Sequence, residues 1–446
     1  MLHPQCIFLN SLPSDVESSY SKSLSQLVPA DALKCVLSTF VAEPEWIFDS
    51  LPILLQVPLF FFIGDTSILP ILKSFPRPNS APLTVLKPRL PLPYGTHHSK
   101  FLISFCPNRL TVAITTANLA EADFLCRNQL SFYQEFAKLS SPNTSPDFKF
   151  KDPLKEYLST IGLDSNWITE LDNFDFSTAA GFLVASVPGV FAGDRMSKWG
   201  QGRLRSILGT SPRSVLKPRK TVDKDPNPKE NVSCLPSIIP KHGTICCSSL
   251  GRITKPFLTS MCVTLGFASM SLIWPTVDNV RNSVIGYLSG GSLCANQRNF
   301  SDDLKQRLCR WEPVVPSNNL PNAFSLSSDL LVRSMCMHHL KAFVCGSPDN
   351  INHVLITSHN FSAAAFGQYS TTQDSLTIRS YELGVLFRSC PELPLKCFES
   401  CCFDSPHLFV PLPFHLPAPR YTEKDEFWCW DVPHSEPDIM GRRFTP

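Results

Sequence analysis

Charge is scarce in this sequence, and neither sign dominates. Only 17% of the 446 residues are charged, and 40 basic residues against 38 acidic ones give a formal net charge of +2. A strong net field is therefore excluded, and any polyanionic partner must be held by a local basic site. Long apolar runs are also missing. The longest, residues 51–63, contains two prolines, is too short to span a bilayer, and predicts a buried strand at Leu59–Ile63.

Cysteine is abundant, but its arrangement does not suggest disulfides. The 17 cysteines are odd in number and occur partly as adjacent pairs, and the first ten residues lack the basic flank and apolar run of a secretory signal. We therefore expect a soluble intracellular protein with reduced thiols. Cys390, Cys397, Cys401 and Cys402 match no common zinc spacing, so we expect buried free thiols there, and neither a metal nor a cofactor.

The length and the hydrophobic content favour two mixed domains. A chain of 446 residues is long for one domain, and 43% hydrophobic residues can bury a large core. Its 40 prolines, about 9% of the chain, predict many loops and argue against a helical array.

An internal repeat indicates how the chain is organised. His98-Ser99-Lys100 is followed after 17 residues by Asn118, and His339-Leu340-Lys341 is followed after 18 residues by Asn360. Both copies then continue as Asn-[Leu/Phe]-[Ala/Ser]-x-Ala-x-Phe. Two matches in register over about 27 residues indicate a duplicated domain.

Each copy has the pattern of strands followed by a helix. The four predicted strands are Lys100–Phe105, Leu110–Thr115, Ala342–Cys345 and Val354–Thr357. Helices are predicted elsewhere at Asp31–Phe40, Asp152–Ile161 and Trp199–Leu208. We therefore predict an α/β fold with two similar domains, residues 1–188 and 189–446, and a flexible insertion at 209–241.

Two histidines and two lysines, one pair from each half, suit attack on a phosphodiester. A neutral imidazole can attack phosphorus and form a phosphohistidine, and a second imidazole can protonate the leaving oxygen. The ammonium groups of Lys100 and Lys341 would stabilise the phosphoryl oxygens without a metal ion, and the amides of Asn118 and Asn360 could donate to the same oxygens.

A nucleophilic imidazole also needs an acceptor at its far nitrogen. Glu382 and Gln129 each follow one copy of the motif and are the candidates for this role. A Glu partner would suit the nucleophile and a Gln partner the residue that must also release protons. The sequence leaves open which residue supports which histidine.

The paired motifs resemble those of the phospholipase D superfamily. Most of that superfamily carries an Asp where this sequence has Phe105 and Gly346, and the form with only a later Asn resembles the tyrosyl-DNA phosphodiesterase family. Further similar segments are Tyr94–His98, Ile273–Arg281, Gly286–Ser292, Arg379–Phe387 and Trp428–Pro433. The resemblance implies two phospholipase D-like domains, each a mixed sheet between helices, related by a pseudo-twofold axis with the active site at their interface.

The resemblance also implies individual roles. His98 would be the nucleophile and His339 the proton donor and acceptor, with Lys100, Lys341, Asn118 and Asn360 on the phosphate. Gln129 and Glu382 would support the histidines. DNA contacts would come from Tyr94, Ser249, Ser362 and Trp430. Ala363 and Cys246 stand where the family often has a lysine and a serine, which predicts a weaker or displaced DNA track.

The implied function is hydrolysis of 3′-phosphotyrosyl and other 3′-adduct bonds between DNA and a trapped topoisomerase. The implied partners are DNA with a blocked 3′ end, single-stranded or at a nick or duplex end, and the topoisomerase-derived peptide. A monomer located in the nucleus, with the cytoplasm as a second compartment, is expected. Two alternatives remain open, namely a phospholipase D-type lipid phosphodiesterase or nuclease, and a non-catalytic DNA-binding scaffold.

Overall fold

The computed structural model describes residues 5–13, 19–77, 81–210, 241–314, 333–391, 393–397 and 407–446. The predicted insertion at 209–241 therefore lies almost wholly outside the described residues. Cys401 and Cys402 lie outside them as well.

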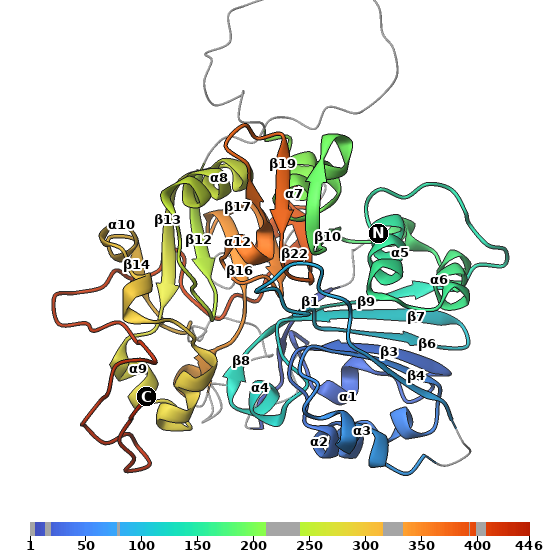
Figure 1. Cartoon of the computed structure of the whole chain (residues 1–446), viewed down its shortest axis with the longest axis horizontal. Helices are drawn as coiled ribbons and strands as arrows, with labels where there is room; N and C mark the ends of the chain where they lie inside the picture. The colour runs from blue at the N-terminus through green and yellow to red at the C-terminus, as the bar shows by residue number, and fades with distance from the viewer. Residues whose placement is uncertain are drawn as a thin grey trace, which may run out of the picture.

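The first half is built on an eight-stranded sheet, the blue and teal part of Figure 1. Its strand order is β2-β1-β9-β7-β6-β3-β4-β5. The strands are β1 (Ile7–Asn10), β2 (Ser21–Lys22), β3 (Lys34–Thr39), β4 (Leu59–Ile63), β5 (Leu83–Leu86), β6 (Phe101–Phe105), β7 (Arg109–Thr115) and β9 (Leu130–Ala137).

The second half is built on a nine-stranded sheet whose main path runs β10-β20-β17-β16-β12-β13-β14. These strands are β10 (Phe182–Ser186), β12 (Lys241–Cys246), β13 (Phe267–Trp274), β14 (Leu308–Arg310), β16 (Ala342–Ser347), β17 (Asn350–Thr357) and β20 (Glu382–Arg388). Two short strands, β21 (Leu395–Lys396) and β22 (Leu408–Phe409), extend the sheet beside β17.

The two sheets repeat one topology. Reading from β1 in one sheet and from β10 in the other, the first four pairings are antiparallel and the last two are parallel in both. Identical order and direction over seven strands confirm the α/β prediction with two similar halves.

Smaller pairings complete the strands. A three-stranded sheet contains β11 (Gly189–Ala192), β18 (Gln368–Tyr369) and β19 (Ser375–Ile378). One parallel pair joins the halves, β8 (Arg127–Asn128) with β15 (Met337–His338).

Short helices cover the sheets. In the first half these are α1 (Leu24–Leu27), α2 (Pro44–Ser50), α3 (Leu69–Ser74), α4 (Glu121–Leu125), α5 (Lys151–Ile161) and α6 (Ser165–Glu170). Later in the chain come α7 (Gly200–Leu208), α8 (Lys255–Leu265), α9 (Val277–Arg281), α10 (Asp302–Lys305) and α12 (Ala363–Phe366). Short 3₁₀ helices lie at η1 (Pro52–Leu55), η3 (Leu171–Asn173), η4 (Phe176–Thr178), η5 (Gly193–Lys198), η6 (Gly286–Ser292) and η7 (Gln297–Asn299). None of the described helices is long and apolar enough to cross a membrane.

Two sequence predictions about the fold were wrong. The predicted helix Asp31–Phe40 is strand β3, which is almost entirely buried between two neighbouring strands, so its apolar run is that of an interior strand. The predicted domain boundary at 188/189 comes too late, because β10 pairs with β20 of the second sheet. By sheet membership the second half begins before Phe182, since β10 takes the place in its sheet that β1 takes in the first.

Helix α5 packs at the junction of the halves. Its buried face includes Tyr157, whose hydroxyl lies 2.5 Å from the Ser99 hydroxyl of the first motif. The Tyr157 ring also meets Tyr381 of the second half, with centroids 6.3 Å apart. The helix therefore packs against residues of both halves beside His98.

Candidate active site

Backbone contacts between the halves fix both histidines. The His98 amide donates to the Tyr381 carbonyl at 3.0 Å, and the His339 amide donates to the Asn128 carbonyl at 3.1 Å. Glu382 follows the acceptor Tyr381, and Gln129 follows the acceptor Asn128. The two backbone hydrogen bonds between the halves are therefore equivalent under the pseudo-twofold relation. Each imidazole is thus anchored to the opposite half.

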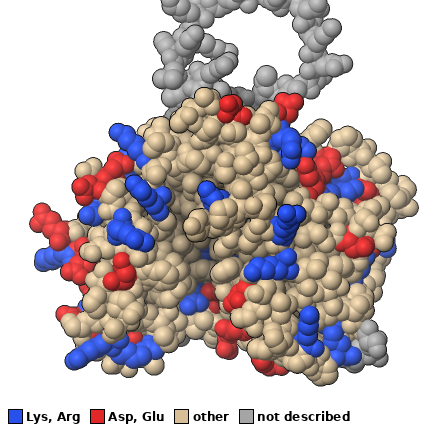
Figure 2. All heavy atoms as spheres, in the orientation of Figure 1, with Lys and Arg blue, Asp and Glu red and all other residues tan. Residues whose placement is uncertain are grey.

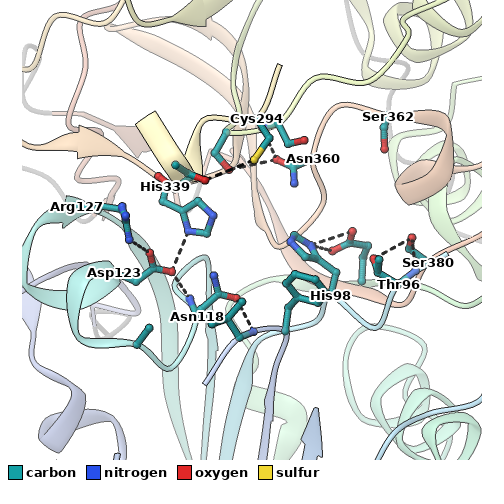
Figure 3. Close-up of a pocket in the computed structure, with 18 of the residues that line it drawn as sticks. Thr96, His98, Asn118, Asp123, Arg127, Cys294, His339, Asn360, Ser362 and Ser380 are labelled. Carbon is teal, nitrogen blue, oxygen red and sulfur yellow. Dashed lines mark hydrogen bonds and ion pairs between the residues drawn. The ribbon is translucent and has the colours of Figure 1, made fainter. Parts of the chain in front are cut away.

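The histidines line one cavity of about 570 Å³. The face in Figure 2 is hollowed between the halves, and basic and acidic side chains are mixed across it. Figure 3 shows the two imidazoles reaching the same space from opposite sides. Predicted site residues on the wall of this cavity are Tyr94, His98, Asn118, Ser249, His339, Asn360, Ser362 and Glu382.

His98 is held by Glu382. Its Nδ1 lies 3.1 Å and 2.9 Å from the two carboxylate oxygens, and the Ser358 hydroxyl donates to the same carboxylate at 2.5 Å. Burial and then Lys100 and Lys341 lower the pKa of His98, while Glu382 opposes them. Since the carboxylate accepts the Nδ1 proton, the Nε2 lone pair of a neutral imidazole is left for a substrate.

His339 is held by a residue that the sequence interpretation missed. Its Nδ1 lies at an ion-pair distance of 3.0 Å from Oδ2 of Asp123, a carboxylate on α4 that is 2% exposed, although the contact does not have the geometry of a hydrogen bond. Burial lowers the pKa of His339 to about 3, and Asp123 opposes this. A signal for Asp123 existed in the repeat, because the matching position in the second copy is Ala365. A difference of charge within matched copies marks a place where the halves are specialised.

Gln129 is not the residue found at Nδ1 of His339. Its side-chain oxygen accepts from the Thr116 hydroxyl at 2.7 Å, just as Glu382 accepts from Ser358. Gln129 therefore occupies the place equivalent to Glu382. No hydrogen-bond partner of its buried Nε2 is found within the described part of the chain. The structure pairs Glu382 with His98, one of the two pairings that the sequence left open.

Both lysines lie behind the histidines and are fully buried. Lys100 Nζ donates to the His98 carbonyl at 2.7 Å, and Lys341 Nζ donates to the His339 carbonyl. Burial, followed by repulsion from Lys341, lowers the pKa of Lys100 to about 7. Burial lowers the pKa of Lys341 to about 8 despite Asp123 and Glu382. The ammonium groups are thus close enough to repel each other, although neither is on the cavity wall.

The two asparagines present their amide nitrogens to the cavity. The Oδ1 atom of Asn118 accepts from the Val41 amide at 3.4 Å, and that of Asn360 accepts from the Ser249 amide at 3.1 Å. With the oxygens occupied, the Nδ2 atoms point toward the space between the imidazoles (Figure 3). Both side chains are oriented to donate to an anion there.

The predicted DNA-contact residues are partly brought together. Tyr94, Ser249 and Ser362 line the cavity, and Tyr94 is 91% exposed with a left-handed φ of 60°. The Ser362 hydroxyl accepts from the Ala365 amide and caps α12. Trp430 lies away from the wall, with its indole nitrogen donating to Asn296 Oδ1 at 2.7 Å.

The described cysteines and other possible metal ligands are not gathered into a metal site. Among the described residues, no group of three or more His, Cys, Asp or Glu side chains is placed to hold a metal ion. Of the four cysteines expected to be buried thiols, Cys397 is buried, but Cys390 is exposed, so the expectation was wrong there; the other two residues lie outside the described ranges.

Known proteins match this chain along most of its length. The tyrosyl-DNA phosphodiesterase family matches residues 8–422. Tyrosyl-DNA phosphodiesterase 1 of Arabidopsis thaliana is 27% identical over 486 residues, which cover 97% of this chain and 75% of the relative. A probable tyrosyl-DNA phosphodiesterase of Caenorhabditis elegans is 28% identical, with 96% and 89% covered.

The crystal structure of the yeast tyrosyl-DNA phosphodiesterase has the same fold. It superposes with a TM-score of 0.66 at 16% identity, covering 95% of this chain and 99% of that one. The fold implied by the sequence resemblance is thereby confirmed. With a family match that extends over most of the sequence, the chain belongs to the tyrosyl-DNA phosphodiesterase family.

Proposed function

We propose that this protein is a DNA repair hydrolase that cleaves the phosphodiester bond between a DNA 3′ end and a tyrosine or another 3′ adduct. Membership of the family supports a hydrolase acting on phosphodiester bonds. The observation that carries the chemistry is the cavity between the halves, where two imidazoles, each beside a carboxylate, approach from opposite sides.

In the first step His98 attacks phosphorus through Nε2. The N–P bond forms as the P–O bond to the tyrosine breaks, and His339 gives its proton to the departing phenolate oxygen. Glu382 stabilises the positive charge that develops on His98. Burial disfavours the charged form of His339, and Asp123 opposes this effect. When the substrate binds, the negative charge of its phosphate adds to that of Asp123, and both raise the pKa of His339 so that it can carry the proton.

In the second step water attacks the phosphohistidine. His339, now neutral, takes a proton from the water, the O–P bond forms, and the N–P bond to His98 breaks. The products are a DNA 3′-phosphate and free enzyme. His98 is thus the nucleophile of the first step and the leaving group of the second, while His339 first releases and then accepts a proton.

Positive charge and amide donors surround the reacting phosphoryl group. Asn118 and Asn360 are placed to bind its oxygens directly. Lys100 and Lys341 add charge from behind, and a bound phosphate raises the pKa of both ammonium groups toward their ordinary range. This electrostatic support is the role that a metal ion would otherwise fill.

The residues around the mouth of the cavity suit a nucleic acid. We propose DNA as the polymer, with the exposed Tyr94 ring stacking on a base and the hydroxyls of Ser249 and Ser362 near its phosphates. The leaving group would be a topoisomerase-derived peptide. We propose that the protein works as a monomer in the nucleus, where this substrate arises.

The test compares substrates from different classes. Purified protein is incubated with an oligonucleotide carrying a 3′-phosphotyrosine, with an unmodified oligonucleotide, and with phosphatidylcholine, and His98→Ala serves as the control. We expect release of tyrosine and a 3′-phosphate from the first substrate, and no turnover by the variant. Preferential cleavage of phosphatidylcholine would favour a lipid phosphodiesterase instead. Binding of DNA without any turnover would favour a scaffold protein.

A further inference from the structure

Three groups share the carboxylate of Asp123. Its Oδ2 lies 3.0 Å from His339 Nδ1 and accepts from the backbone N–H of Asn118 at 2.7 Å. Its Oδ1 accepts from the Arg127 guanidinium at 2.7 Å. Figure 3 shows these side chains on one wall of the cavity. Asp123 therefore joins the segment that carries Asn118 to the imidazole of the opposite half.

Among the described residues, Glu382 on the other side of the cavity has no guanidinium partner of this kind. Glu382 has its two oxygens on His98 and one bond from the Ser358 hydroxyl, a neutral donor. Asp123 instead faces a permanent cation, the guanidinium of Arg127. The sequence repeat places Ala365 where Asp123 would recur, and the matching backbone crossings place Gln129 where Glu382 would recur. In the part of the chain that the structure describes, Asp123 thus has a directly paired cation, whereas Lys100 acts on Glu382 without an ion pair and donates to the His98 carbonyl instead.

We propose that Asp123 is the positioning residue for His339, and that Arg127 weakens its hold so that His339 can both give and accept a proton. The proposal rests on the function proposed above. Asp123 keeps the Nδ1 proton and aims Nε2 at the cavity, which fixes the tautomer that can act on the leaving oxygen and on water.

The charges around His339 set the direction of each effect. Within the described residues the ionisable groups that act on it are Asp123 and Arg127 from the first half and Lys341 on its own segment, with His338 next to it in sequence. Burial opposes the ionisation of Asp123, but His339, Arg127 and the Asn118 amide keep its pKa far below the usual range. Asp123 thus stays an anion and raises the pKa of His339, whereas Arg127 lowers it.

The test uses two variants with opposite expected signs. Asp123→Asn removes the anion and should lower the pKa of His339, moving the acidic limb of the adduct-hydrolysis rate to lower pH and slowing that step about 10–100-fold. Arg127→Gln should raise the same pKa and move the limb to higher pH. Asp31→Asn, which breaks a surface ion pair with Arg109, is the matched control and should leave the acidic limb at the pH of the wild type.

A second readout does not depend on turnover. Nitrogen-15 spectra of histidine-labelled protein, with the His339 signals assigned by their loss in His339→Asn, should give an Nδ1-protonated ring in the wild type and a mixed tautomer in Asp123→Asn. If Asp123→Asn folds but has the wild-type tautomer and the wild-type acidic limb, the proposal is overturned. If Asp123→Asn does not fold, the Arg127→Gln shift decides, and a shift to lower pH would overturn it. Absence of turnover in the wild type would refute the proposed function, and the spectra would still decide this inference.

Discussion

Nδ1 of His98 lies 2.9 Å from Oε2 of Glu382, a residue 284 positions later in the chain. The contact crosses from one half of the molecule to the other, and its counterpart, His339 with Asp123, crosses in the opposite direction. Each half therefore supplies an imidazole and the carboxylate for the other half's imidazole. Neither half could form a complete site alone.

Glu382→Gln should lower the rate of the first step at least about tenfold. The amide fills the same space but cannot stabilise the developing imidazolium with a negative charge. Single-turnover release of tyrosine from a 3′-phosphotyrosyl oligonucleotide measures this step. A Glu382→Gln rate equal to that of the wild type would contradict the support of His98 by this carboxylate.

His339→Asn should slow hydrolysis of the adduct more than its formation, because the second step needs a base that the amide cannot supply. A covalent enzyme–DNA species should accumulate and be visible on a denaturing gel. His98→Ala should form none, which is the control. Failure to trap any adduct at short times would count against the division of roles between the histidines.

Activity should survive excess EDTA, because two ammonium groups already offset the phosphoryl charge. The measurement is the initial rate before and after exhaustive chelation. A complete loss of activity that a divalent ion restores would contradict the two-lysine explanation.

Tyr94→Ala should raise KM for DNA with little change in kcat, since stacking on a base is worth about 1–3 kcal/mol. Its left-handed φ of 60° suits glycine, so Tyr94→Gly should raise KM equally but be the more stable of the two variants. Steady-state kinetics and thermal unfolding of the pair separate the ring from the backbone. An unchanged KM in both variants would exclude the stacking role.

The folded protein should lose stability as the pH falls from about 6.5 toward 3. Burial lowers the pKa of His97, His338 and His353 to about 3, so the unfolded chain binds protons in this window while the native state does not. His353 is fully buried and stacks on Phe267, with ring centroids 6.4 Å apart. His353→Phe should flatten the dependence by about 1.4 kcal/mol per pH unit within that window. Denaturant unfolding from pH 7.5 to 5 checks this, and a stability that rises on acidification would refute it.

The sequence by itself determined the repeat, most of the strands in it, and the side chains that meet in the cavity. Strand β4 spans the predicted residues, and the helices predicted at 152–161 and 199–208 correspond to α5 and α7. These features follow from periodicity and from motif spacing, which are local properties of the chain. Local pattern failed for β3, because an interior strand buried on both faces has the same apolar content as a buried helix.

Only the tertiary structure decided the partners of the histidines. The repeat offered Gln129 and Glu382 as equivalent supports, but α4 places the carboxylate of Asp123 beside His339, 216 residues away in sequence. The tertiary structure also places the lysines behind the histidines and pairs β10 with a strand of the second sheet. The partners of the histidines depend on how two similar halves meet, and contacts between residues so far apart in the chain leave no periodic trace in the sequence.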